Sequence, residues 1–182
     1  MDAVRDQFWA KGYAATSVDD LMKATGLGKG SLYGAFGGKR QLFLTVLDTY
    51  AAARVGEVRA ALAGAAPAVQ RLRAALRFTP SDAGPVPFDR GCFLANSSTE
   101  MAARDEEILT RARRTYARVE ALIVETVQTA VDEGDLLPDT DTQSLGRLIF
   151  ALMQGIEFLT KTGMPPKNLD AIGIAAADRL LH

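Results

Sequence analysis

The sequence has little of the chemistry that most enzymes and metal centres use. Its 182 residues include one cysteine, Cys92, and one histidine, the terminal His182. A single cysteine excludes an internal disulfide and a cysteine-rich metal centre, and a single histidine removes most zinc sites and catalytic triads. We therefore expect no enzymatic activity, no metal ion and no cofactor.

The sequence also has no long apolar run, and one stretch, residues 21–47, has no acidic residue. No uncharged apolar run reaches the ~18–20 residues that a membrane span needs, and no leader-like segment opens the chain. We expect a soluble, cytoplasmic protein without membrane contact. The net charge is -1, yet residues 21–47 contain four basic and no acidic side chains. Such a patch is able to lie against phosphates, although an ordinary solvated surface is the simpler interpretation.

Strand patterns are nearly absent, whereas helical spacing of apolar residues is frequent, so the sequence predicts an all-α fold. Segments 2–11, 18–25 and 28–35 have this spacing and are separated by glycines. Two short helices joined by a glycine turn form a helix-turn-helix. At that turn we expect Gly26 to adopt a positive φ and Leu27 to fill the core. A compact three-helix core without a role in DNA binding is the alternative.

The remainder of the chain predicts longer helices. We expect them over residues 39–63, 67–78, 91–103, 105–133, 141–162 and 168–181. Segment 141–162 is apolar around most of its circumference, so it needs burial on two sides. A homodimer that pairs the last two helices as a four-helix bundle provides this burial. The predicted interface residues are Leu148, Leu152, Gly155, Ile156, Leu159, Ile172, Ala176 and Leu180.

An ordered series of motifs near the N-terminus resembles the TetR family of transcriptional regulators. The series consists of GYAATSVDDL at 12–21, ATGLGKGSLY at 24–33, FGGK at 36–39 and LF at 42–43. The stretch from Gly91 to Asn96, followed by Glu100, resembles AcrR-like effector domains. The resemblance implies a DNA-binding head over residues 1–47 and an effector-binding and dimerisation body over 48–182. It further implies a homodimeric regulator, expected to be a repressor, on a palindromic operator of double-stranded DNA.

Recognition helices present their N-terminal residues to the major groove, and helix N-termini bind phosphate. We therefore expect base or phosphate contacts from the exposed small and polar residues around the two short helices, with Lys39 as a phosphate clamp. These residues are Thr16, Ser17, Lys29, Gly30, Ser31, Tyr33 and Lys39. Ser17 also fits a helix N-cap, with Asp20 completing a capping box.

The family resemblance also implies a small lipophilic or reactive effector that binds the body and releases DNA. Apolar side chains with a few convergent polar groups suit such a ligand. The candidate residues are Phe78, Phe88, Cys92, Asn96, Glu100, Tyr116, Met153 and Gln154. Cys92 is a candidate sensor thiol, with a buried small hydrophobe as the simpler reading. The alternative function is an all-helical module that binds small molecules or partners without operator-specific DNA binding.

Overall fold

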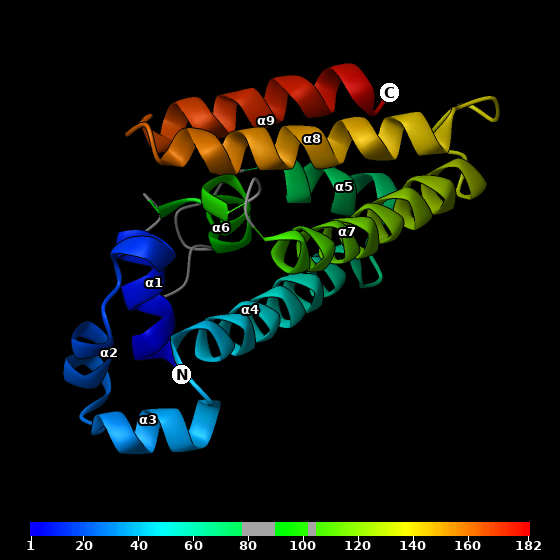
Figure 1. The fold of residues 1–182 in the computed structure, drawn as a ribbon. Coiled ribbons are helices and arrows are strands. Elements are labelled where there is room, and N and C mark those ends of the chain that lie inside the picture. The colour runs from blue at the N-terminus through cyan, green and yellow to red at the C-terminus, as the bar shows by residue number, and fades with distance from the viewer. Residues whose placement is uncertain (78–89, 102–104) are drawn as a thin grey trace. The chain divides into compact units, whose positions relative to one another are not determined.

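The computed structural model describes residues 1–77, 90–101 and 105–182, and within them it contains helices and no strand (Figure 1). The all-α prediction is confirmed. The helices are α1 (Asp2–Ala15), α2 (Val18–Thr25), α3 (Lys29–Phe36), α4 (Lys39–Leu62), α5 (Ala68–Leu76), α6 (Phe93–Met101), α7 (Glu106–Asp132), α8 (Thr142–Thr160) and α9 (Pro166–Leu180). None of the described helices is long and apolar enough to cross a membrane.

Local sequence signals explain where the short helices begin and end. Ser17 caps α2 and forms the predicted capping box with Asp20. Gly26 and Gly37 end α2 and α3 with φ values of 70° and 75°, which side chains other than glycine rarely adopt. Asp141 caps α8 by accepting a hydrogen bond from the Ser144 amide. The positions of these helices in the chain are therefore set by their own end residues.

Gly12 interrupts α1 at the position where the sequence predicts that the first helix ends, directly after residue 11. Its φ of 80° and ψ of 169° are not helical, and one further helical turn follows to Ala15. The amides after Gly12 therefore lie at the start of a new turn and have no helical acceptor behind them.

The contacts of the chain group it into two compact units. We call residues 1–53 with 93–114 the head unit, and residues 54–92 with 115–182 the body unit. The head unit thus contains α1, α2, α3 and α6 together with the first parts of α4 and α7. The division after residue 47 that the sequence suggests remains a prediction about function.

Aromatic rings fill the core of the head unit. Phe43 lies 5.0 Å from Phe8 and 5.9 Å from Phe93, measured between ring centroids. The prediction that Leu27 enters this core is wrong, because Leu27 is 43% exposed. The buried apolar side chain of α3 is Leu32 instead.

The body unit has an aliphatic core to which α5, α8 and α9 contribute, and these three helices pack together (Figure 1). Close helix packing depends on small residues at two points. Gly146 of α8 lies against Val124, and Gly173 of α9 lies against the backbone of Leu76, so that a Cβ at either glycine would collide. Gly155, by contrast, has no neighbour within 4 Å of a Cβ position. The two glycines of α8 therefore lie on different faces of that helix.

Candidate functional site

The N-terminal half of α3 forms an exposed face of small and polar residues. Lys29, Gly30 and Ser31 are exposed, and Tyr33 is 40% exposed, whereas Leu32 between them is buried. The Lys29 Nζ lies 5.8 Å from the centre of the Tyr33 ring. We call these four exposed residues the reading face. Their placement on one helix surface is what a recognition helix requires.

Ser17 is exposed at the start of α2, but its hydroxyl already has partners. Its Oγ accepts a hydrogen bond from the Asp20 amide at 3.0 Å and donates to the Asp20 carboxylate at 2.7 Å. The side chains of Lys11 and Ser17 donate to this carboxylate and hold the pKa of Asp20 well below its usual range. A permanent negative charge at this helix N-terminus competes with a phosphate for the same amides.

Thr16 and Lys39, both predicted to contact phosphate, are turned toward the protein. Thr16 is fully buried, and its hydroxyl donates to the Gly12 carbonyl at 2.6 Å. Its side chain is therefore removed from the set that can reach DNA. The Lys39 amino group donates to the carbonyls of Tyr13 and Thr16, each at 2.8 Å, and lies 4.4 Å from the centre of the Tyr13 ring. A phosphate contact from Lys39 would compete with these bonds.

Glu100, predicted at the effector site, contacts the head unit instead. Its carboxylate accepts hydrogen bonds from the amides of Tyr13 at 2.9 Å and Ala14 at 2.8 Å. The assignment to the effector site is corrected, because both carboxylate oxygens are already bound to backbone amides. Asn96 lies half-buried on the same helix, α6, in the head unit.

Polar side chains gather inside the body unit around Tyr116. Its hydroxyl shares a hydrogen bond with the Cys92 side chain, and its ring lies 5.5 Å from that of Phe150. Burial is the main cause of a raised Tyr116 pKa, with smaller contributions from Cys92 and Glu157. Cys92 itself is 5% exposed.

The partly buried carboxylate of Glu157 belongs to the same polar cluster around Tyr116. Glu157 lies 3.3 Å from the Arg54 guanidinium and 3.5 Å from the Gln154 amide nitrogen. Burial raises the pKa of Glu157 despite the opposing effect of Arg54. The sequence does not predict a role for Arg54, because nothing in the local pattern links it to a residue 103 positions away. Met153 is half-buried against the aliphatic core, and Phe78 and Phe88 lie outside the described residues.

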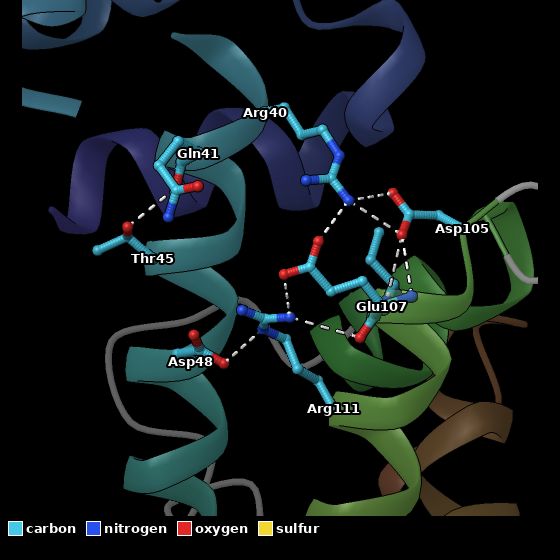
Figure 2. A network of polar contacts seen from close by, with 8 residues as sticks. Arg40, Gln41, Thr45, Asp48, Asp105, Glu107 and Arg111 are labelled. Atoms are coloured by element: carbon cyan, nitrogen blue, oxygen red, sulfur yellow. Dashed lines mark hydrogen bonds and ion pairs between the residues drawn. The ribbon is translucent and has the colours of Figure 1, made fainter. Parts of the chain in front are cut away.

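A network of charged side chains joins the starts of α4 and α7 (Figure 2). Arg40 pairs with Asp105 at 3.0 Å and Glu107 at 2.6 Å, and Arg111 pairs with Glu107 at 2.8 Å and Asp48 at 2.9 Å. Hydrogen bonds from Arg40 and Arg111 lower the pKa of Glu107. Two of the four bases between residues 21 and 47, Lys39 and Arg40, are thus held by internal contacts.

An apolar stripe lies open to solvent on α8 and α9. Phe158 is 63% exposed, and the other exposed members are Leu148, Ala151, Gly155, Ala171, Ile174 and Ala175. Of the predicted interface, Leu148 and Gly155 lie in this stripe. Five others are half-buried: Leu152, Leu159, Ile172, Ala176 and Leu180. The prediction for Ile156 is corrected: its side chain is 6% exposed, because it lies on the buried face of α8 with Gly146 and Ile149 and not in the stripe.

Two family models match this chain. The model described as "Bacterial regulatory proteins, tetR family" matches residues 1–46, and "Tetracyclin repressor-like, C-terminal domain" matches residues 68–172, more than half of the chain. The chain belongs to the TetR family. It is a TetR family transcriptional regulator with a helix-turn-helix formed by α2 and α3.

Individual relatives agree with this assignment. The HTH-type transcriptional repressor ComR of Escherichia coli K12 is 27% identical over 175 residues, which cover 93% of this chain and 81% of ComR. A TetR transcriptional regulator from Chloroflexus aurantiacus is 27% identical with a TM-score of 0.82, covering 97% of this chain and 89% of that one. A cysteine-substituted CifR, solved on 26-base-pair operator DNA, is 26% identical with a TM-score of 0.82, covering 98% and 93%.

The structure of this TetR family regulator therefore brings some of the predicted site residues together and gives others a different role. The reading face comes together on α3. Cys92, Tyr116 and Gln154 belong to the polar cluster of the body unit. Glu100 and Lys39 bind backbone groups of the head unit, a role that depends on tertiary contacts and has no local sequence signal.

Proposed function

We propose that this TetR family regulator is a homodimeric repressor that binds a palindromic operator and leaves it when a small lipophilic or reactive effector binds the body unit. The reading face of α3 is the observation that carries the proposal. Side chains at the start of a recognition helix reach base edges and phosphates of the major groove. Two of the three relatives point the same way, because ComR is a repressor and CifR was solved on operator DNA.

Each residue of the reading face has a distinct role in this proposal. A Cβ at Gly30 would meet no atom within 4 Å, and the missing side chain lets DNA approach the backbone of α3. The Tyr33 hydroxyl reaches a phosphate. Lys29 binds a guanine edge or a phosphate. Thr16 has no part in the contact, whereas Ser17 contributes its hydroxyl only by giving up a bond to Asp20.

The open apolar stripe on α8 and α9 supports the homodimer. An exposed phenylalanine and leucine on one continuous face are costly in water and are covered when two copies pair about a two-fold axis. Two reading faces then reach successive major grooves about 34–36 Å apart, which requires two half-sites of opposite orientation.

The polar cluster around Tyr116 supports an effector site in the body unit. Cys92, Tyr116, Gln154 and Glu157 offer a thiol, a hydroxyl, an amide and a carboxyl group in surroundings that disfavour charge. An effector that forms polar bonds there, or that reacts with the thiol, changes the packing of the body unit. It releases DNA to the extent that it binds the DNA-free conformation more tightly.

Selection of bound sequences from a random pool of duplex DNA tests the proposal. We expect the full chain to enrich one palindromic sequence and Tyr33→Ala to lose that enrichment. The matched control is Lys167→Gln, an exposed change on α9 that we expect to leave enrichment intact. Enrichment of no sequence by a folded wild-type dimer would contradict the proposal and favour a ligand-binding module instead.

A further inference from the structure

Residues 12–16, which are the last turn of α1 after the break at Gly12 together with Thr16, are held through both their amides and their carbonyls, and we call them the linker. The Glu100 carboxylate of α6 binds the amides of Tyr13 and Ala14 at 2.9 Å and 2.8 Å. The Lys39 ammonium group of α4 binds the carbonyls of Tyr13 and Thr16 at 2.8 Å. We call Glu100 and Lys39 the linker clamp. Both residues and the linker belong to the head unit, in which α1 packs against α6 (Figure 1).

The break in α1 explains why a carboxylate is needed at this position. After Gly12, the amides of Tyr13 and Ala14 begin a new turn and have no acceptor within the helix. A negative charge is favoured at such a helix start, and bonds from amides to a carboxylate are stronger than those to a neutral acceptor. A Cβ at Gly12 would lie 2.7 Å from Glu100 Oε2, so glycine is also what allows the carboxylate to come close.

The linker leads without interruption into the DNA-binding helices. Thr16 is followed by Ser17, the N-cap of α2, and a three-residue turn then joins α2 to α3. The buried Thr16 hydroxyl binds the Gly12 carbonyl across the same linker. A linker fixed at its amides and its carbonyls therefore fixes where α2 begins relative to α6.

We propose that Glu100 is a positioning residue for operator binding: its carboxylate holds residues 12–16 so that α2 and α3 take the orientation that fits the operator. The inference rests on the proposed function, since it requires that the reading face of α3 contacts DNA. Glu100 is not a DNA contact in this proposal. It acts through Tyr13 and Ala14, and Lys39 completes the clamp from the carbonyl side.

Whether operator affinity rises or falls when the charge of Glu100 is removed distinguishes a positioning role from a purely electrostatic one. Removing a negative charge from a DNA-binding unit strengthens attraction to phosphate. Loss of positioning instead weakens specific binding. Glu100→Gln keeps the shape of the side chain but replaces one acceptor oxygen by a donor, which faces an amide that also donates. The matched control is Glu106→Gln, which removes the same charge from an exposed residue of α7 whose partner is the exposed Arg113.

The experiment measures the affinity of the full-length dimer for its selected operator and for a scrambled duplex at one salt concentration. For Glu100→Gln we expect operator affinity to fall at least ~10-fold, while affinity for the scrambled duplex is unchanged or rises. For Glu106→Gln we expect neither affinity to fall. Hydrogen exchange at the Tyr13 and Ala14 amides should accelerate in Glu100→Gln alone, since only that variant removes one of the two oxygens that accept from them.

Two results would overturn the role of Glu100 while leaving the proposed function intact. One is operator affinity in Glu100→Gln that equals or exceeds that of the wild type. The other is an equal fall in operator and scrambled-duplex affinity, which reports a loss of folded protein rather than of orientation. A wild type that does not prefer its selected operator refutes the proposed function itself, and the role of Glu100 with it.

Discussion

Replacing Lys29 by glutamine is expected to weaken operator binding about 60-fold at 0.1 M salt. Each phosphate contact contributes about 0.9 to the slope of log affinity against log salt concentration. A dimer carries two copies of Lys29, so the change removes about 1.8 from the slope and about 1.8 decades of affinity at 0.1 M. The exposed position of Lys29 on α3 is the structural reason for assigning it a full contact.

The number of exposed bases gives an expected value for the total slope. Of the four bases between residues 21 and 47, Lys23 and Lys29 are exposed, whereas Lys39 and Arg40 are held by the linker, Asp105 and Glu107. We expect Lys23 and Lys29 to contact one phosphate each, which gives about four contacts per dimer and a fall in affinity of about 150-fold between 50 and 200 mM salt. Four contacts per head would give a fall of about 2 × 10⁴-fold.

Fluorescence anisotropy on labelled operator at several salt concentrations measures both quantities. The matched control is Arg40→Gln, which removes the same charge from the network between α4 and α7 and should leave the slope unchanged. A slope that falls as much for Arg40→Gln as for Lys29→Gln would show that Arg40 leaves its carboxylates for phosphate, and would refute the assignment.

Three further changes test the body unit. Phe158→Glu should convert the dimer to a monomer in sedimentation equilibrium. Leu137→Glu should not, because Leu137 is equally exposed but lies off the α8–α9 stripe. A dimer in both variants would refute the interface. Burial raises the pKa of Glu157, so the charged carboxylate lowers the free energy of unfolding above that pKa, and this destabilisation disappears as the pH falls and the group is protonated. Glu157→Gln should therefore melt above the wild type at pH 8 and lose this advantage toward pH 5; a difference in melting temperature independent of pH would contradict the shift. Alkylation by N-ethylmaleimide should lower operator affinity in the wild type and leave Cys92→Ser unaffected, and equal affinity before and after alkylation of the wild type would dismiss a sensor thiol.

The helix-turn-helix could be predicted because its signals are local. The capping box at Ser17, the break at Gly12 and the turn at Gly26 depend on residues within one or two helical turns. Each is found in the structure at the predicted position. The exposure of Leu27 could not be predicted, because the sequence of a turn does not indicate whether a neighbour such as Leu32 already fills the core.

The partners of charged residues could not be predicted in the same way. Glu100 binds amides 86 and 87 positions earlier in the chain, and Lys39 binds carbonyls 23 and 26 positions earlier. Backbone amides and carbonyls are nearly the same in every residue, so no pattern of side chains predicts such a bond. The all-round apolar composition of α8 likewise leaves open which face Ile156 takes, and only tertiary packing decides it.

The place of α6 in the head unit limits how such regulators can be recombined. A hybrid that takes residues 1–47 from this chain and the rest from another protein would keep every motif of the DNA-binding region. It would nevertheless lose Phe93, whose ring lies 5.6 Å from Trp9 and 5.9 Å from Phe43, and the carboxylate of Glu100 that holds the linker. A working hybrid must carry α6 along with the first helices, because the unit that can be exchanged is defined by contacts and is discontinuous in the sequence.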